Sequence, residues 1–367
     1  MPRRLIPNFA PQLSATMDKT NFHILCRNKR FIIGGVVVLA LLLTGALAVW
    51  SLLGGHFHPE EETYLYIDRD DTRDSVLHKL ELCGGASRLT TLSQLMKMKG
   101  YTPKTGRYAI EAGESNLHFF RKIAAGRQTP LMLSVGNPRT VFDLARSLGA
   151  QLETDSAEIA ALMTDSAYID SLGGYTLQTL PAFFVPNSYE VYWDIRPKAL
   201  FSRLKREHDA FWDAKDRRED AARMGLSPVE VATLASIVDA ETNYTPEKPR
   251  VAGLYLNRLH QGMKLQSDPT VVFSAGDFSI RRVGHKHLQT DSPYNTYLYE
   301  GLPPGPIRIA SIAGIDAVLH AEQHDYLYMC AREDFSGSHR FAATWGEHQR
   351  NARLYQQALN RRNIRVK

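Results

Sequence analysis

The chain has 367 residues and a formal net charge of +5, with 44% hydrophobic and 23% charged residues. These proportions are typical of a globular protein, and the length leaves room for two or three domains. The charge excess is modest and no basic tract is interleaved with aromatic residues, which argues against nucleic-acid binding. Such an excess is compatible with an anionic surface or polymer as partner, but it most often reflects solvated side chains.

A polar and basic segment, residues 1–30, precedes an uncharged run at 31–53, FIIGGVVVLALLLTGALAVWSLL. A run of this length can cross the hydrocarbon core of a bilayer, which takes about 20 residues. Because the lysines and arginines come first, the positive-inside rule predicts a cytoplasmic N-terminus, a single transmembrane helix and an external remainder. The alternative is a cleaved signal peptide, for which the run is long and lacks a clear small-x-small cleavage site.

Three cysteines are present, Cys26, Cys83 and Cys330. The first lies beside the predicted span on its cytoplasmic side. The other two share the outer compartment, where a disulfide is permitted, but they fall in different predicted domains, so we expect two free thiols. No cysteine or histidine spacing suggests a metal site, and we expect none.

Residues 62–135 are predicted to form a small α/β module, because β-favouring runs alternate with helical segments there. The expected elements are strands at 64–67, 107–110 and 131–135, helices at 72–82, 88–99 and 115–125, and turns at 84–85 and 113. Residues 140–180 are expected to be mainly helical, with one helix ending at Gly149 and a second spanning 156–172. A charged amphipathic helix is predicted at 198–222, and its charges suggest a solvated face.

The most informative stretch is 227–306. Its first four residues, SPVE, form a helix start with a capping box. Apolar residues then recur at helical spacing up to Val238, and Glu241 extends the same stripe. A carboxyl on the core-facing side of a helix loses hydration, so its pKa should rise toward the range that a general acid needs. A solvated helix end is the competing interpretation of Glu241, and Asp239, on the opposite flank, is the weaker acid candidate.

The remaining elements are predicted from local composition. A second helix should start at Thr245 and end at Gly262, and the residues at 271–273 favour a strand. Residues 301–307 contain too much proline and glycine for helix or central strand and predict a stiff loop suited to holding side chains for binding. The C-terminal part is expected to contain a helix at 309–320, a buried strand at 326–331, a partner strand at 339–341 and a helix at 346–361.

Several motifs follow one another in this part of the chain. They are ASIVDAET at 235–242, VA at 251–252 with LNRL at 256–259, GMKLQSDPTV at 262–271, DSPYNTY at 291–297 and GLPPGPI at 301–307. In this order they resemble the motifs of the MltG/YceG-like endolytic murein transglycosylases of bacterial cell envelopes. The resemblance implies that Glu241 is the catalytic acid and base. Many relatives carry Glu-Lys-Glu-Thr at 239–242, and only the second acidic position is glutamate here, which favours Glu241 over Asp239.

The resemblance also implies an α+β fold in which one part spans the membrane and two parts lie outside the cytoplasm. These are the transmembrane helix at 31–53, a LysM-like module at 62–135 and a larger mixed α/β catalytic domain at 136–367 with a lysozyme-like catalytic helix. LysM modules elsewhere bind glycans containing N-acetylglucosamine, so the module either contacts glycan or spaces the active site from the membrane. The implied location is the bacterial inner membrane, with the catalytic domain outside the cytoplasm and peptidoglycan synthases as candidate partners.

Polar residues of the family motifs are the expected lining of the site: Asn257, Gln266, Asp268, Tyr294 and Asn295. His339 resembles a family position that follows a glycine, and it is a weaker candidate for the cleft, since a lone histidine is more often structural.

A further motif, FFVPNSYEVY at 183–192, also resembles the family. Aspartate is usual there at the position of Asn187, so a role that needs a carboxylate is doubtful at this residue. Tyr189 and Glu190 are candidates for lining a sugar groove, although tyrosines of an aromatic strand more often belong to the core or its rim.

The implied reaction cleaves the β-1,4 bond between N-acetylmuramic acid and N-acetylglucosamine in peptidoglycan glycan strands, without a cofactor. Protonated Glu241 gives its proton to the leaving oxygen, and its carboxylate then takes the proton of the muramic 6-hydroxyl, which closes a 1,6-anhydro ring. One carboxylate suffices because the nucleophile belongs to the substrate and is already positioned. The alternatives are a lysozyme-like hydrolase that uses Glu241 with Asp268, and a non-catalytic, anchored wall-binding protein.

Overall fold

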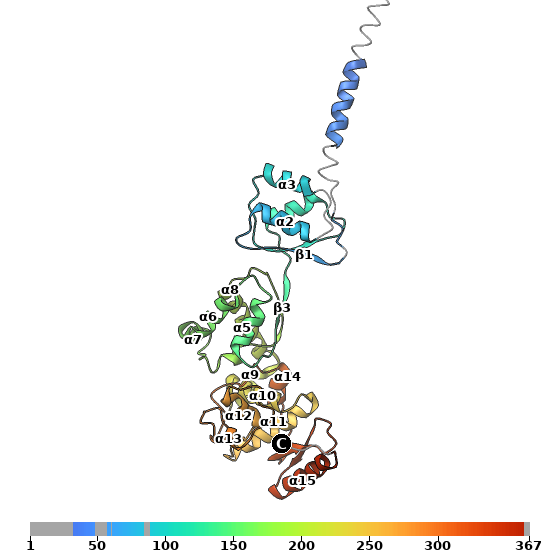
Figure 1. Cartoon of the computed structure of the whole chain (residues 1–367). Helices are drawn as coiled ribbons and strands as arrows, with labels where there is room; N and C mark the ends of the chain where they lie inside the picture. Colours follow the sequence, from blue (N-terminus) through green and yellow to red (C-terminus); the bar gives the residue numbers. More distant parts are fainter. Residues whose placement is uncertain (1–31, 48–56, 60, 84–88, 363–367) are drawn as a thin grey trace, which may run out of the picture. The chain divides into compact units, whose positions relative to one another are not determined.

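The computed structural model describes residues 32–47, 57–59, 61–83 and 89–362 of the chain, which divides into two compact units, residues 1–128 and 129–367 (Figure 1). Residues 32–47 are helical. The rest of the span predicted at 31–53 lies outside the described residues, as do the N-terminal segment with Cys26 and the turn at 84–85. Within the described ranges, no helix combines the length and the apolar character needed to cross a membrane.

The first unit packs helices against a two-stranded antiparallel sheet. Its strands are β1 (Thr63–Ile67) and β2 (Gly106–Ile110), and its helices are α2 (Arg73–Leu82), α3 (Leu89–Met98) and α4 (Asn116–Ala125). The five elements predicted between residues 64 and 125 are confirmed to within one residue at each end. Alternate strand residues such as Leu65 and Tyr108 are fully buried with Phe119 of α4, so one face of the sheet forms the core of this unit.

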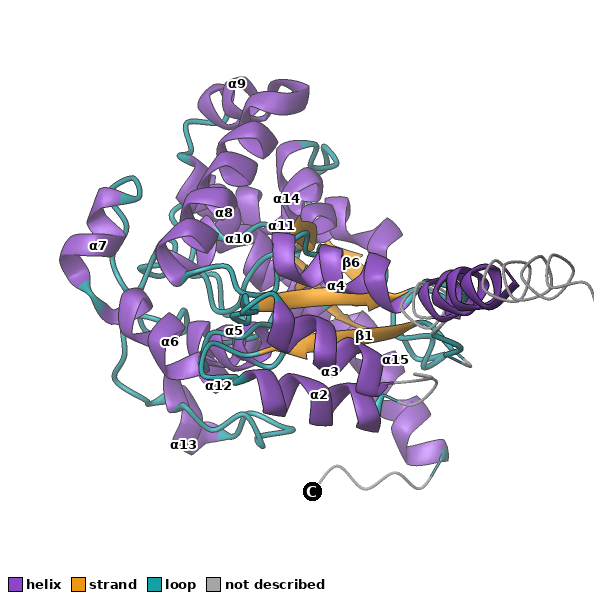
Figure 2. Cartoon of the chain, turned by 90° about the horizontal axis from the view of Figure 1, so that it is seen from above, coloured by secondary structure: helices purple, strands orange, loops and turns teal. Residues whose placement is uncertain are grey.

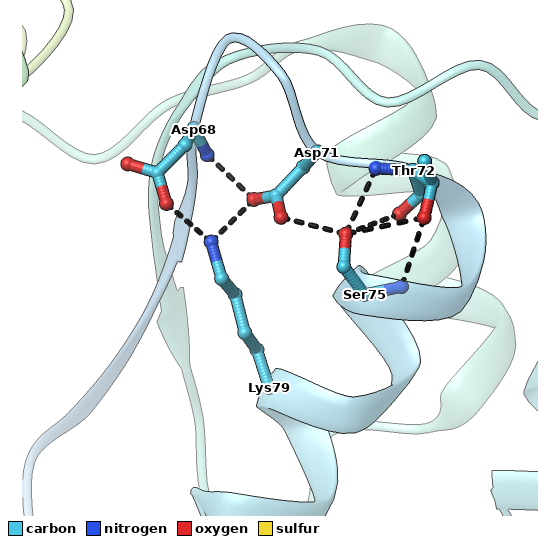
Figure 3. A network of polar contacts seen from close by, with 5 residues as sticks. All are labelled: Asp68, Asp71, Thr72, Ser75 and Lys79. Atoms are coloured by element: carbon cyan, nitrogen blue, oxygen red, sulfur yellow. Dashed lines mark hydrogen bonds and ion pairs between the residues drawn. The ribbon is translucent and has the colours of Figure 1, made fainter.

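A polar network fixes the turn between β1 and α2 (Figure 3). Lys79 contacts the carboxylates of Asp68 and Asp71, and Asp71 accepts hydrogen bonds from the Asp68 amide and the Ser75 hydroxyl, both at 2.6 Å. Burial acts to raise the pKa of Asp71, but the hydrogen bonds from Lys79 and Ser75 outweigh it and hold this pKa below its ordinary value. The stability that this carboxylate contributes is therefore present at neutral pH and is lost only as the pH falls through its lowered pKa.

The second unit opens with an antiparallel sheet of β3 (Leu131–Val135) and β4 (Asn187–Val191). The sequence assigned β3 to the end of the 62–135 module, whereas the structure pairs it with a strand more than fifty residues further on. The reason is packing, because Leu133 and Val135 are buried in a core shared with the helices that follow. These are α5 (Val141–Gly149), α6 (Ser156–Thr164), α7 (Ser166–Ser171) and the 3₁₀ helix η1 (Leu180–Phe183).

Two long helices of the sequence prediction are each divided in the structure. The one expected at 156–172 breaks at Asp165, whose extended backbone ends α6 and whose side chain caps α7. The one expected at 198–222 is α8 (Pro197–Asp213) and α9 (Arg217–Arg223), joined by the 3₁₀ helix η2 (Ala214–Asp216). Lys215 and Asp216 have φ values of 58° and 55°, and a left-handed backbone cannot continue a right-handed helix.

Helix α10 (Pro228–Glu241) is central to the rest of the unit and begins with the predicted capping box of Ser227 and Glu230. Every residue from Val231 to Asp239 is buried. The sequence predicted burial along a single apolar stripe, whereas the helix is buried on nearly all sides. Four other helices pack against it, namely α9, α11 (Lys248–His260), α12 (Asp268–Ala275) and α14 (Ile312–Leu319) (Figure 1). A helix that is apolar on nearly all sides is one that neighbours surround.

Replacing Ser227 with alanine tests how much this cap stabilises α10. The Ser227 hydroxyl accepts from the Glu230 amide at 3.3 Å, and the Ser227 amide donates to the Glu230 carboxylate at 2.7 Å. Losing the side-chain cap should lower the free energy of unfolding by about 1 kcal/mol. Urea unfolding followed by circular dichroism measures this, with Ser202→Ala on the exposed side of α8 as the control. An unchanged midpoint for Ser227→Ala would show that the cap contributes nothing.

The segment at 271–273 was expected to favour a strand, and this prediction is wrong, because it lies in α12. Pro269 is placed in the first turn of this helix, and Gly276, with φ of 64°, ends it. Thr270 and Val271 are buried against α10, so tertiary packing overrides the local β preference. Helix α11 follows the 3₁₀ helix η3 (Thr245–Glu247), and Gly262 adopts the left-handed conformation shortly after α11 ends, as predicted.

The last part of the unit contains α13 (His285–Leu288), α14, the antiparallel pair β5 (Tyr328–Ala331) and β6 (His339–Ala342), and α15 (Trp345–Arg361). Strand β5 was expected to be buried, but its residues are all partly exposed in the small sheet that it forms with β6, against which α15 packs. Residues 301–307 form a loop without helix or strand, as predicted.

Cys83 and Cys330 are free thiols in different units. Seen from above, helices predominate over strands in the described part of the chain (Figure 2).

Candidate active site

Glu241 is the last residue of α10, and its carboxyl meets two hydroxyl groups from other elements. Its Oε1 accepts hydrogen bonds from Tyr255 Oη on α11 at 2.7 Å and from Ser267 Oγ at 2.6 Å. No hydrogen bond from the described part of the chain reaches Oε2. With both donors on Oε1, a proton on this carboxyl belongs on Oε2.

The surroundings of Glu241 favour its protonated form. Burial is the main cause and raises its pKa, and the nearby charge of Asp268 acts in the same direction. The hydroxyl donors Ser267 and Tyr255, together with the charge of His339, lower the pKa but do not cancel the effect of burial. A carboxyl with a raised pKa can hold a proton closer to neutral pH, as a general acid must.

Glu241 lines a cavity of about 310 Å³. The other walls come from α11, the segment 265–268, Tyr297, strands β5 and β6 and the start of α15. Aromatic and polar side chains are mixed in this lining, with Tyr297 and Trp345 beside Asp268 and His339. Such a lining suits a sugar, whose rings have apolar faces and hydroxyl edges.

The segment that carries Ser267 is held by Arg258, which is buried. Its guanidinium donates to the carbonyls of Lys264 and Leu265 at 2.9 and 3.0 Å, and to Gln266 Oε1 at 3.2 Å. Gln266 has a φ of 53°, a left-handed conformation that turns the chain there. This anchored turn brings Ser267 to the Glu241 carboxyl.

The structure brings three of the predicted site residues together, since Gln266 and Asp268 line the same cavity as Glu241. Asp268 is exposed, and its Oδ1 accepts a hydrogen bond of 2.7 Å from Tyr297 Oη. A second carboxylate therefore stands in the cavity of the candidate acid.

Three other predicted residues have structural contacts away from this cavity. Asn257 donates to two backbone carbonyls before β5 at 2.6 and 3.1 Å. Asn295 is fully buried and donates to two carbonyls at 3.0 and 2.8 Å. The ring of Tyr294 packs on Phe273 with 4.7 Å between centroids. Their polar groups shape the loops around the cavity rather than its lining.

The motif at 183–192 is not part of the Glu241 cavity in the structure. Tyr189 is buried in the core around β4, and its hydroxyl donates to the Val185 carbonyl at 2.6 Å. Glu190 is exposed and lines a different, open pocket with Tyr192.

His339, the weaker candidate, does line the Glu241 cavity. Its Nδ1 lies 2.8 Å from Glu247 Oε2, and its backbone amide donates to Glu247 Oε1 at 2.8 Å. Glu247 is buried, so this pairing fixes the orientation of the imidazole ring beside Glu241.

Asp239 has a different role from Glu241, although both are acidic residues of α10. It is 5% exposed and pairs with Lys248 Nζ at 2.5 Å. It also accepts from the Ser311 amide at 2.6 Å and the Ser311 hydroxyl at 2.8 Å. The carboxylate thus joins α10 to α11 and to the start of α14.

Sequence reasoning did not identify the two hydroxyl donors of Glu241. Tyr255 falls within the helix predicted from Thr245 to Gly262, where apolar residues at helical spacing include it, and Ser267 falls within a motif, but neither was named as a site residue. The available signal was Tyr255 itself, because a tyrosine in an apolar stripe buries a hydroxyl that needs a partner. No group of three or more potential metal-ligating side chains was found in the described part of the chain.

Comparisons with known proteins agree with this architecture. A crystal structure of a YceG-like protein from Listeria monocytogenes superposes with a TM-score of 0.55 at 24% identity, over 79% of this chain and 99% of that one, which shows a common fold. A protein of Bacillus subtilis named endolytic murein transglycosylase is 38% identical over 135 residues, 37% of each chain. One of the same name from Streptococcus pneumoniae is 24% identical over 359 residues, 88% of this chain. The chain matches only 37% and 64% of the length of these two relatives.

A match over a longer part of the chain shows the family to which this protein belongs. The sequence profile of the YceG-like family matches residues 65–354, a range that covers parts of both compact units and every residue that lines the cavity around Glu241. This range is well over half of the 367 residues. The chain therefore belongs to the YceG-like family, with the mixed α/β fold of that family.

Proposed function

We propose that this chain is a peptidoglycan lytic transglycosylase that cleaves within glycan strands and uses Glu241 as general acid and then as base. The observation that carries the proposal is the carboxyl of Glu241, which has a raised pKa, two hydroxyl donors on one oxygen and a place in the wall of a sugar-sized cavity. Membership of the YceG-like family and the names of the relatives support it.

The proposed reaction follows from the geometry of this carboxyl. Tyr255 and Ser267 hold Oε1, so the proton on Oε2 passes to the glycosidic oxygen between N-acetylmuramic acid and N-acetylglucosamine as the bond to the anomeric carbon breaks. The resulting carboxylate accepts the proton of the muramic 6-hydroxyl, whose oxygen bonds to the anomeric carbon and closes a 1,6-anhydro ring. The products are an anhydro end and a free 4-hydroxyl, and no water is consumed.

We further propose that the protein works at the outer face of the bacterial inner membrane, held by residues 31–53. The uncharged run and the preceding lysines and arginines support this placement. An enzyme anchored there would meet glycan strands as they are made, beside the synthases that make them. The first unit, between the span and residue 129, would either contact glycan or act as a spacer.

One observation favours a second candidate function, a lysozyme-like hydrolase. Asp268 lines the same cavity as Glu241, and hydrolysis by the usual route needs two carboxyl groups flanking the bond. In this alternative, Asp268 would act on water or on the anomeric carbon while Glu241 protonates the leaving oxygen.

Product analysis separates these candidates. Purified protein would be incubated with uncrosslinked peptidoglycan strands, and the fragments identified by mass spectrometry. Transglycosylation gives 1,6-anhydro ends, which are 18 Da lighter than the reducing ends that hydrolysis gives. We expect anhydro ends inside the strands. Reducing ends alone would establish the hydrolase, and no fragments at all would favour a wall-binding protein.

The hydroxyl donors of Glu241 should set the pH range of the reaction. A general acid must be protonated, so activity should fall as the pH rises through the pKa of Glu241. Hydrogen bonds to the carboxylate stabilise its charged form, and Tyr255→Phe removes one of them, so the pKa should rise further and the alkaline limb of kcat/KM should move to higher pH. Rates across pH 4–9 measure this, with Tyr192→Phe on the surface as control. A limb that stays in place or moves to lower pH would contradict the assigned contact.

A further inference from the structure

A second cavity, of about 450 Å³, meets the Glu241 cavity at Asp268, which lines both. Its wall also includes Asp239 and Ala240, the residues of α10 that directly precede the candidate acid, and Asn243 just after it. A polymer that lies across Glu241 would therefore extend from one cavity into the other. The second cavity therefore lies where the part of the substrate on one side of the cleaved bond would bind.

Cationic side chains gather around this second cavity. Its lining includes four arginines: Arg139, Arg281, Arg282 and Arg308. No carboxylate of the described residues forms an ion pair with Arg139, Arg281 or Arg308. The Nε of Arg308 is buried and has no hydrogen-bond partner in the protein, although its Nη2 donates to the Asn137 carbonyl at 3.0 Å. The charge of Arg308 is therefore not balanced by an acidic partner among the described residues.

The acidic residues in the same wall do not neutralise these arginines. Asp239 is paired with Lys248, and Asp268, which keeps its charge beside the neutral Tyr297, can offset only one of the arginines. The arginines therefore leave an excess of positive charge at this cavity.

Another arginine-rich pocket, lined in part by residues of β6, provides a contrast. Three of its arginines are paired there with acidic side chains, in the pairs Arg250–Glu322, Arg332–Asp334 and Arg340–Glu333. Uncompensated arginines are thus a property of the cavity beside Glu241 and not of every arginine-rich surface of this protein.

The second cavity is also partly apolar. Phe273, Phe278, Ile280 and Val283 contribute to its lining, and the guanidinium of Arg139 lies 5.0 Å from the centroid of the Phe278 ring. Sugar rings without charged substituents carry no negative charge with which the arginines could pair. Short peptides with aliphatic side chains and free carboxylates match both features.

We propose that this arginine-lined cavity binds the carboxylates of the stem peptide on the muramyl residue beside the cleaved bond. The inference rests on the proposed function and deepens it, because it makes the substrate a glycan strand that still carries its peptides. Stem peptides hang from every second sugar and end in a free carboxylate, so a cavity next to the bond must meet one. Planar guanidinium groups bind carboxylates through paired hydrogen bonds, which orients the strand as well as holding it.

The test compares two substrates that differ only in their peptides. Lipid-free, uncrosslinked strands would be used intact or after an amidase has removed the stem peptides, so that no terminal diphosphate is present in either. For the unaltered full chain we expect kcat/KM to be about tenfold higher on the intact strands, the equivalent of about one good charge-assisted contact. In the double variant Arg139→Gln with Arg281→Gln, the ratio of the two rates should fall close to one.

Arg206→Gln on the exposed face of α8 removes one arginine charge away from both cavities and should keep the tenfold ratio. Thermal unfolding of the double variant shows whether it folds, and neither arginine has an ion pair to lose. Equal rates of the unaltered protein on both substrates would overturn the inference, as would a double variant that keeps the full ratio. These results would leave the proposed function intact as long as anhydro products form, whereas its failure would appear as reducing ends alone or as no cleavage of either substrate.

Discussion

Replacing Glu241 with glutamine is expected to lower the rate of strand cleavage by about a thousandfold or more. General acid–base catalysis contributes about 10²–10⁴ in rate, and here one residue performs both the acid and the base step. The amide oxygen of glutamine can still accept the hydrogen bonds of Tyr255 and Ser267, so the change removes the transferable proton and little else. Release of soluble fragments from labelled strands measures the loss.

The matched control is Glu219→Gln, which removes the same charge from an exposed position on α9 and should leave the rate unchanged. Stability provides a second check. Because burial raises the pKa of Glu241, its charged form is disfavoured in the folded protein, and this costs stability as the pH rises above the ordinary glutamate range. Glu241→Gln should therefore unfold at the same or a higher temperature at pH 7. A variant that is well folded and still releases fragments at the parent rate would remove Glu241 from the mechanism.

Replacing Asp239 with alanine should have the largest effect on stability. The change leaves the Lys248 ammonium buried without its partner and removes both acceptors of Ser311. Breaking a buried ion pair on one side typically costs about 3–5 kcal/mol. For a unit of this size the unfolding temperature should fall by about 10 °C. Calorimetry or thermal circular dichroism measures the shift.

A second substitution distinguishes an unpaired charge from a mere loss of packing. Adding Lys248→Met to Asp239→Ala removes the isolated cation, so the double variant should recover part of the lost stability. If the double variant is instead less stable by the sum of the two single effects, the ion pair contributes little and the contacts with Ser311 account for the loss. Activity should fall in the single variant at temperatures where it remains folded, because Asp239 connects α10 to the elements that surround Glu241.

The sequence predicted most elements well where a local signal defines them. The capping box at Ser227 and the glycine at Gly262 give the start of α10 and the region where α11 ends, because caps and left-handed glycines act within a few residues of the chain. Short β-favouring runs that alternate with helical segments gave every element between residues 64 and 125. The errors occurred where distant contacts decide, as in α12, whose β-favouring residues are helical because Thr270 and Val271 pack against α10.

The sequence by itself determined the family, through ordered motifs, and singled out Glu241, whose place on the apolar stripe of α10 depends only on helical periodicity. Only the tertiary structure decided what surrounds that carboxyl. Tyr255 and Ser267 are 14 and 26 residues from it in the chain, and Asn257 and Asn295, which also lie in family motifs, make backbone contacts elsewhere. Spacing along a chain fixes which side of a helix a residue occupies, but the direction of loop side chains depends on packing between elements that are far apart in sequence.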